Sequence, residues 1–126
     1  MTTQTPKKKT KMKQKHKNKI ILKGIAASAG VAEGLVKIVV GIKDNAKFQE
    51  GDVLVAKFTE PSMVPMMIKA SAIVTDIGGI TSHAAIVSRE MGTPCVVATK
   101  DATNILKDGQ RVRVDGAKGK VYTIEE

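Results

Sequence analysis

The sequence predicts a single β-rich α/β domain, and three observations support this. Several short β-branched segments are bounded by glycine, proline or aspartate, which is typical of strands. Residues 83–91 have the composition and the boundaries of a helix. The chain has 126 residues, so residues 20–126 suffice for one domain with its own core. With two Phe, one Tyr and no Trp, that core must consist of Val, Ile, Ala, Leu and Met.

Residues 1–19 form a separate, lysine-rich tail. They hold eight lysines and no acidic residue, and without them the net charge of +9 falls to +1. A like-charge block with few apolar residues favours a disordered segment. Weak contact with nucleic acid, anionic lipid or an acidic partner is one interpretation. A solvated extension, or a translation start placed too far upstream, is the preferred one.

Composition also excludes several classes of function. The apolar run at 20–22 is broken by Lys23 and Gly24, so it is too short for a signal peptide or a membrane span. We expect a cytoplasmic protein. The single cysteine, Cys95, excludes an internal disulfide and is expected to be buried in an apolar run. One histidine outside the tail and one cysteine predict no metal site, and no ATP-binding phosphate loop is present.

The first half of the chain predicts strands separated by loops. We expect strands at 20–25, 35–40 and 52–56. The small residues of 24–34 predict a loop, and the polar residues of 43–50 predict a connection.

The segment 59–69 predicts a short helix that begins at Pro61 and is limited by Pro65. Its three methionines, Met63, Met66 and Met67, have two interpretations. They fill gaps in a core that lacks aromatic residues, which is the preferred interpretation, or they form an adaptable docking surface.

The second half predicts alternating elements around one helix. The apolar residues of 72–75 and 95–98 predict buried strands, and 101–107 predicts a short helix with Asp101 as N-cap. The alternating segments 111–114 and 120–124 predict a hairpin closed by a glycine-containing turn.

The segment between the two buried strands carries the candidate site. Gly78 and Gly79 predict a sharp turn that a ligand can approach closely. Thr81 and Ser82 are good N-cap residues, and the helix that follows begins at His83. Gly92 and Pro94 end that helix in the expected order.

A histidine in the first helical turn lies among free N–H groups and partial positive charge. This environment would stabilise a phosphoryl group on His83. Thr81, Ser82 and the backbone N–H groups of Gly78 and Gly79 are expected to contact the phosphoryl oxygens.

Two further side chains near His83 have weaker interpretations. Arg89 lies about 1.7 turns along the helix, too far to contact the phosphoryl group directly. It forms either a surface ion pair, with Glu60 or Asp76, or a docking contact. Ser82 and His83 are adjacent on one turn and point apart, which argues against a serine hydrolase.

The whole string at 78–97 is Gly-Gly-x-Thr-Ser-His-Ala-Ala-Ile-Val-x-Arg-Glu-x-Gly-x-Pro-x-Val-Val. It resembles the phosphohistidine signature of the phosphoenolpyruvate-utilising enzymes, with the strongest likeness to phosphoenolpyruvate synthase and pyruvate phosphate dikinase. The resemblance extends from Gly24 to Tyr122. It departs at Ser28-Ala29-Gly30, where the family usually has Ser-Pro-Gly. It implies a swivelling β/β/α phosphohistidine fold that is partly barrel-like.

The resemblance also implies roles for residues and partners. His83 would carry the phosphoryl group, and Thr81 corresponds to a regulatory phosphorylation site of some dikinases. In the family this domain moves between an ATP-binding domain and a barrel that binds pyruvate or phosphoenolpyruvate. No such domains fit into 126 residues. We therefore expect a phosphohistidine subunit that binds no cofactor itself, with ATP, Mg²⁺ and phosphoenolpyruvate or pyruvate on separate subunits.

Two alternatives remain open. The chain is a non-catalytic binding or regulatory module with the same fold, or it is the carrier subunit of another small-molecule phosphotransferase.

Overall fold

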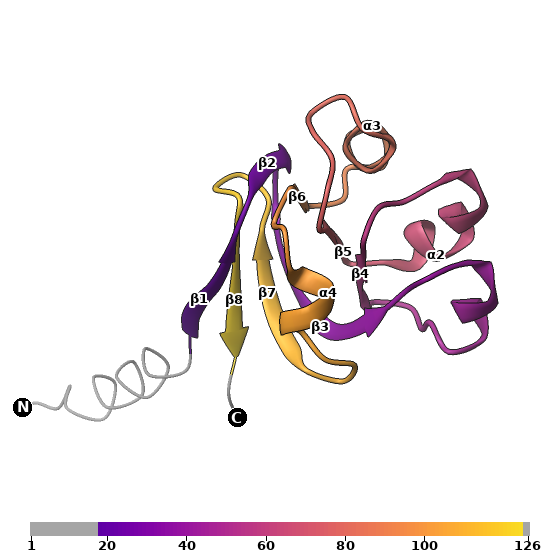
Figure 1. Ribbon diagram of the computed structural model, residues 1–126, viewed down its shortest axis with the longest axis horizontal. Helices are drawn as coiled ribbons and strands as arrows, with labels where there is room; N and C mark the ends of the chain where they lie inside the picture. Colours follow the sequence, from indigo (N-terminus) through magenta and orange to yellow (C-terminus); the bar gives the residue numbers. More distant parts are fainter. Residues whose placement is uncertain (1–17, 125–126) are drawn as a thin grey trace, which may run out of the picture.

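The structure, a computed structural model, describes residues 18–124 (Figure 1). The strands are β1 (Asn18–Lys23), β2 (Ile25–Ser28), β3 (Val31–Ile38), β4 (Val53–Ala56), β5 (Ala72–Thr75), β6 (Cys95–Val97), β7 (Arg111–Asp115) and β8 (Lys120–Ile124). The helical segments are η1 (Ile42–Ala46), η2 (Pro61–Met63), α2 (Val64–Lys69), α3 (His83–Met91) and α4 (Ala102–Ile105). β1 takes in Asn18 and Lys19 of the predicted tail, and residues 1–17 lie outside the described residues.

The strands form one mixed sheet in the order β1-β8-β7-β3-β4-β5-β6-β2. The sheet has an antiparallel half and a parallel half, and strand β3 belongs to both. Residues 31–35 pair antiparallel with β7, and residues 36–38 pair parallel with β4. β4, β5 and β6 continue in parallel, and β2 pairs antiparallel with β6.

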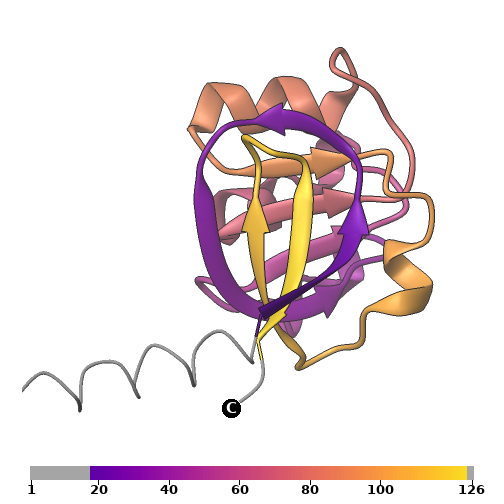
Figure 2. The same cartoon turned by 90° about the vertical axis from the view of Figure 1, so that its left-hand side faces the viewer.

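The sheet curls strongly but stays open. β1 and β2 follow one another in the chain, yet they lie at the two ends of the strand order. In Figure 2 the segment from β1 to β3 runs as an arc around β7 and β8. Because the edge strands do not pair with each other, the expected barrel-like shape is a curled, open sheet.

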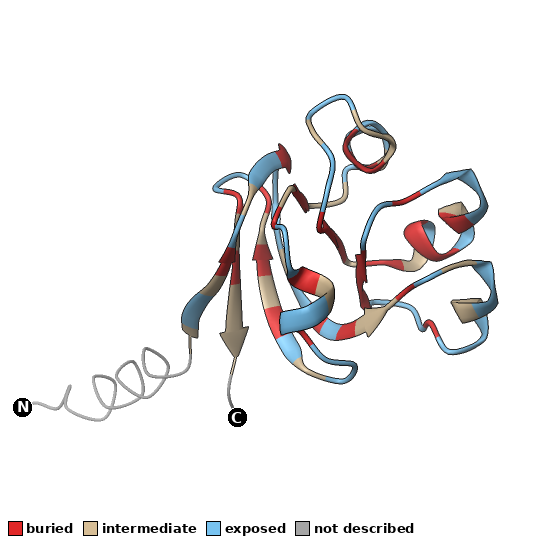
Figure 3. Ribbon diagram, in the orientation of Figure 1, coloured by how far each residue is buried: buried red, intermediate tan, exposed pale blue. Residues whose placement is uncertain are grey.

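Two apolar clusters divide the domain into three layers. One cluster lies between the halves of the sheet and contains Val53, Val55 and Val114. The other lies between the parallel strands and the helices and contains Leu54, Ile73 and Met67. Side chains of β4 and β5 enter the two clusters alternately, as the period of a strand requires. Figure 3 shows these strands buried along their length, and the layering confirms the β/β/α arrangement.

The methionines belong to the core. Met63, Met66 and Met67 are each no more than 2% exposed, so the gap-filling interpretation is confirmed and the docking interpretation is wrong. Cys95 is also fully buried, as predicted.

The predicted loop at 24–34 is wrong, because β2 and the first part of β3 occupy most of it. Small residues stand there because other segments of the same chain pass close by. A Cβ at Gly34, inside β3, would lie 2.4 Å from the carbonyl oxygen of Gly51. A Cβ at Gly24 would lie 2.3 Å from that of Val97. Glycine here permits close packing and does not mark a loop.

Three other boundaries differ from expectation. The strand predicted at 35–40 ends at Ile38, and the polar connection contains the short helix η1. The helix predicted at 101–107 is reduced to the single turn α4. Asp101 stands at its N-cap position, but its side chain caps nothing. The β7–β8 hairpin is confirmed. No helix among residues 18–124 is long and apolar enough to cross a membrane.

Candidate functional site

The candidate site lies at one edge of the sheet. Strands β4, β5 and β6 are parallel, so their carboxyl ends meet at the same edge. Three segments leave from it: 57–59 after β4, 76–82 after β5, and 98–101 after β6. In open α/β sheets this edge is the usual place for ligands. The fold thus brings the glycine loop beside the segment after β4, although the two are far apart in the sequence.

The start of α3 is built as predicted. Ser82 is the N-cap, and its Oγ accepts a hydrogen bond from the Ala85 N–H at 3.4 Å. The same hydroxyl donates to the carbonyl of Gly79 at 2.7 Å. Ser82 therefore fixes both the first helical turn and the loop before it. The helix ends at Gly92, whose left-handed φ of 72° suits glycine.

His83 is held by a residue that the sequence analysis did not identify. Its Nδ1 lies 2.7 Å from the Oγ1 of Thr59, a buried residue on the segment after β4. The imidazole itself is partly exposed, and within residues 18–124 its Nε2 has no hydrogen-bond partner. Nδ1 is therefore the anchored nitrogen and Nε2 the free one. Thr59 lies 24 residues before His83, so no local pattern could have found it.

The two glycines of the loop have different requirements. Gly78 has a φ of +132°, a conformation that side chains rarely adopt, and a Cβ there would lie 3.1 Å from the Ser82 Oγ. Gly79 has no positive φ, and a Cβ there would meet open space. The backbone conformation thus requires glycine at 78, whereas glycine at 79 only keeps the surface clear.

The loop around these glycines is largely exposed. Thr81 is exposed, as are the apolar side chains of Ile77 and Ile80, at 51% and 60%. The Thr81 hydroxyl has no hydrogen-bond partner within the described part of the chain. This side chain is thus accessible from solvent beside His83.

The predicted ion pair of Arg89 with Glu60 or Asp76 is wrong. The guanidinium donates to two backbone carbonyls instead: Nη1 to Ala27 at 3.0 Å and Nη2 to Ile80 at 2.7 Å. It therefore joins β2 to the loop that precedes α3. Asp76 is engaged elsewhere and accepts hydrogen bonds from the N–H and the hydroxyl of Thr103, at the start of α4.

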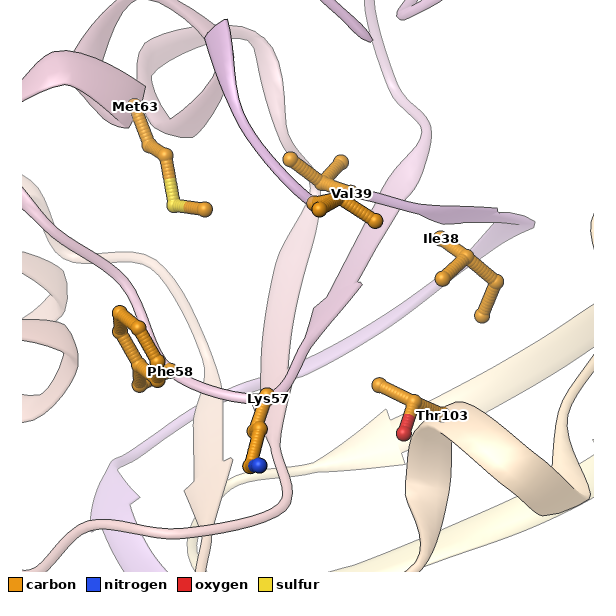
Figure 4. Close-up of a pocket in the computed structure, with 7 residues that line it drawn as sticks. Ile38, Val39, Lys57, Phe58, Met63 and Thr103 are labelled. Carbon is orange, nitrogen blue, oxygen red and sulfur yellow. The ribbon is translucent and has the colours of Figure 1, made fainter.

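A hollow of about 290 Å³ lies at the same edge of the sheet (Figure 4). Its lining is mostly apolar and comes from the ends of β3 and β4, from η2 and from α4: Ile38, Val39, Val40, Lys57, Phe58, Met63 and Thr103. His83 and the glycine loop do not line it, so it contributes no group to the histidine site.

Neither Cys95 nor a cluster of acidic, histidine or cysteine side chains within residues 18–124 offers a second reactive centre. Burial raises the pKa of the Cys95 thiol to about 11, so the thiol stays protonated and unreactive at neutral pH. Between residues 18 and 124, no three His, Cys, Asp or Glu side chains are grouped so that they could hold a metal ion. His83 therefore remains the candidate reactive group.

Comparisons with a family model and with curated relatives point to the same family. Residues 48–119 match the family model of the PEP-utilising enzyme, mobile domain. The chain is 60% identical over 104 residues to the probable phosphoenolpyruvate synthase of Archaeoglobus fulgidus. It is 56% identical over 103 residues to the phosphoenolpyruvate synthase of Pyrococcus furiosus. Each match covers 82% of this chain, which spans only 14% and 13% of those relatives.

A solved structure agrees with this assignment. The solution NMR structure of Enzyme I (nEIt) superimposes with a TM-score of 0.54 at 35% identity and covers 61% of this chain and 32% of that one. The family match includes Thr59, the glycine loop and the whole of α3. The chain therefore belongs to the family of mobile domains of the phosphoenolpyruvate-utilising enzymes.

Proposed function

We propose that this chain is a phosphohistidine carrier: His83 accepts a phosphoryl group from a donor and passes it to an acceptor. The observation that carries the proposal is the anchoring of His83. Its Nδ1 is hydrogen-bonded to Thr59, and its Nε2 is left free at the start of α3. A nucleophilic nitrogen needs a lone pair aimed outward. In this proposal the ring proton lies on Nδ1 and is donated to Thr59, which leaves that lone pair on Nε2.

The proposed transfer has two symmetrical steps. In the first, the Nε2 lone pair attacks phosphorus, an N–P bond forms, and the bond from phosphorus to the donor's leaving oxygen breaks. In the second, an acceptor oxygen attacks phosphorus and the N–P bond breaks. The Thr59 hydroxyl accepts a hydrogen bond from Nδ1–H before the first step. Once the ring is phosphorylated, it releases its Nδ1 proton to solvent, and the Thr59 hydroxyl then donates to Nδ1, since a hydroxyl both accepts and donates. The proton returns to Nδ1 when the N–P bond breaks in the second step.

The surroundings of His83 suit a dianionic group. Phosphoryl transfer depends chiefly on positioning and on stabilising charge. The first turn of α3 supplies free N–H groups and the positive end of the helix dipole. Gly78, Gly79, Thr81 and Ser82 are the proposed phosphate-stabilising residues, through the loop backbone and the two hydroxyls. Thr81 is also a proposed regulatory site, because its hydroxyl is exposed and without a partner among residues 18–124.

The donor and acceptor are proposed to bind elsewhere. This chain spans a small part of its synthase relatives, so ATP, Mg²⁺ and pyruvate or phosphoenolpyruvate belong to partner subunits in this proposal. A cytoplasmic location is part of it. The lysine-rich tail is proposed to make at most weak contacts with anionic partners.

Intact-mass spectrometry tests the proposal. The chain is incubated with ATP and Mg²⁺, or with phosphoenolpyruvate and Mg²⁺, and with the Pyrococcus furiosus synthase whose own phosphohistidine has been replaced by alanine. A phosphoryl adduct that is stable in base, lost in mild acid and absent from His83→Ala supports the carrier. A folded wild-type chain that acquires no adduct would instead support a non-catalytic docking module.

A further inference from the structure

Arg89 lies further along α3 than His83, yet its guanidinium contacts the loop that precedes the histidine. The two residues are six apart, about 9 Å along a helix axis. Helical side chains lean toward the N-terminus, which directs Arg89 back toward the loop. There its two terminal nitrogens reach the carbonyls of Ala27 and Ile80, at 3.0 and 2.7 Å. One guanidinium thus ties an exposed loop to β2.

The bond to Ile80 also fixes the next N–H group. A trans peptide is planar, so the N–H of Thr81 points opposite to the carbonyl of Ile80. That carbonyl is held toward Arg89, so the Thr81 N–H faces the other side of the loop. Ile80 is 60% exposed, and packing alone cannot hold this peptide in place.

Two neighbouring peptides of the loop are held in the same way. The carbonyl of Ile77 accepts from the Thr75 hydroxyl at 2.7 Å, and that of Gly79 accepts from the Ser82 hydroxyl. The N–H groups across these peptides belong to Gly78 and Ile80. Together with that of Thr81, they have no hydrogen-bond partner anywhere in residues 18–124. Three side chains hold carbonyls, and the N–H groups across those three peptides are left free in the described part of the chain.

We propose that Arg89 is a positioning residue: by holding the Ile80 carbonyl it aims the Thr81 N–H at the phosphoryl group on His83. This inference rests on the proposed function and adds to it. In this inference Arg89 acts through the Ile80–Thr81 peptide and not through a contact of its own with the phosphoryl group. Lysine has a single side-chain nitrogen and cannot bind both carbonyls as the two guanidinium nitrogens do. Arg89→Lys should therefore keep the positioning of the Ile80 carbonyl only in part.

The test uses phosphoramidate as the donor, because it needs no partner protein. The Nε2 of His83 displaces ammonia from phosphorus, so one P–N bond forms as another breaks, and the ring proton leaves with the ammonia. We expect Arg89→Met to slow formation of the adduct roughly tenfold, because a donor group is misaligned rather than deleted. The rate of adduct formation in Arg89→Lys should fall between those of wild type and Arg89→Met. Arg113→Met is the matched control, since Arg113 pairs with Glu33 in the antiparallel half of the sheet.

A second measurement separates positioning from simple loss of stability. Urea titration gives the folded fraction of each variant. The ¹H–¹⁵N spectrum of the unphosphorylated protein should show the Thr81 amide shifted in Arg89→Met and unchanged in Arg113→Met. Adduct formation within twofold of wild type, or an unchanged Thr81 amide, would overturn the inference. Should Arg89→Met not fold, Arg89→Lys is judged by the same two criteria.

The proposed function fails in a different way. If wild type acquires no adduct at His83 from phosphoramidate or with the Pyrococcus furiosus synthase, the carrier function is wrong and this inference falls with it. If wild type is phosphorylated and Arg89→Met behaves like it, only the inference is wrong.

Discussion

At the scale of single residues, the site depends on a contact between distant parts of the chain. His83 and Ser82 stand where the sequence predicts them, on the first turn and at the N-cap of α3. No local sequence pattern identifies Thr59, because its contact with His83 depends on the parallel pairing of β4 with β5. Local patterns identify the proposed reactive group, and the fold supplies the residue that binds its Nδ1.

Thr59→Val tests this orientation. Valine keeps the shape of threonine but leaves the Nδ1 of His83 without its partner. We expect phosphorylation of His83 to slow by roughly 10- to 100-fold, as for other residues that orient a reactive group. Thr59→Ser keeps the hydroxyl and should stay close to wild type. Rates of adduct formation with phosphoramidate measure both. Equal rates for the valine and serine variants would show that the hydrogen bond has no role.

Gly78 and Gly79 should respond differently to alanine. Gly78→Ala forces a side chain into a φ of +132° beside Ser82, at an expected cost of about 1–3 kcal/mol in the free energy of unfolding. Gly79→Ala places a methyl group in open space and should change that free energy by less than about 0.5 kcal/mol. Urea titration of both variants checks this, and equal losses would contradict the loop conformation.

Cys95 gives stability a dependence on alkaline pH. Burial raises the pKa of its thiol from 9.0 to about 11 in the folded state. The folded state therefore holds this proton more tightly than the unfolded state does. The stabilisation is complete below about pH 9 and is lost as the pH rises through about 11. The free energy of unfolding should fall by on the order of 2 kcal/mol over this window.

Cys95→Ala removes the titrating group and is the comparison for that prediction. Its unfolding free energy should fall less steeply than that of wild type between pH 9 and 11. Parallel curves for the two proteins would show that the thiol does not titrate in this range.

At the scale of elements, the sequence predicts the apolar strands and the capped helix well. β4, β5 and α3 lie at the predicted positions to within a residue, because each combines a clear apolar pattern with defined ends. β2 and the start of β3 were missed because alanine, serine and glycine have little intrinsic preference for strands. There the pairing with β6 and β7 decides the conformation, and no local pattern carries that information.

Helix α2 offers a test of the core within one element. Met67 is fully buried, whereas the adjacent Ile68 is 65% exposed. Met67→Ala should lower the free energy of unfolding by about 2–5 kcal/mol, through lost transfer energy and a residual cavity. Ile68→Ala should lower it by less than about 0.5 kcal/mol. Urea titration measures both. A larger loss for Ile68→Ala would mean that α2 packs through its other face.

At the scale of the whole molecule, the two ends of the described chain leave side by side. Asn18 and Ile124 are register partners in the β1–β8 pair. Figure 1 shows both ends at the lower left of the domain and α3 at the top. The helix that carries the proposed phosphohistidine thus lies away from the place where the described chain begins and ends. In the synthase relatives the matching segment is likewise only a small part of the chain.

The most direct test of the carrier is a chase of the phosphorylated domain. The chain is phosphorylated with radiolabelled phosphoramidate, freed of the donor and mixed with pyruvate, Mg²⁺ and the Pyrococcus furiosus synthase that lacks its own phosphohistidine. We predict that the label leaves His83 and appears in phosphoenolpyruvate, and that His83→Ala carries no label to transfer. A label that stays on the wild-type domain, or leaves only as inorganic phosphate, would contradict a carrier function in this reaction.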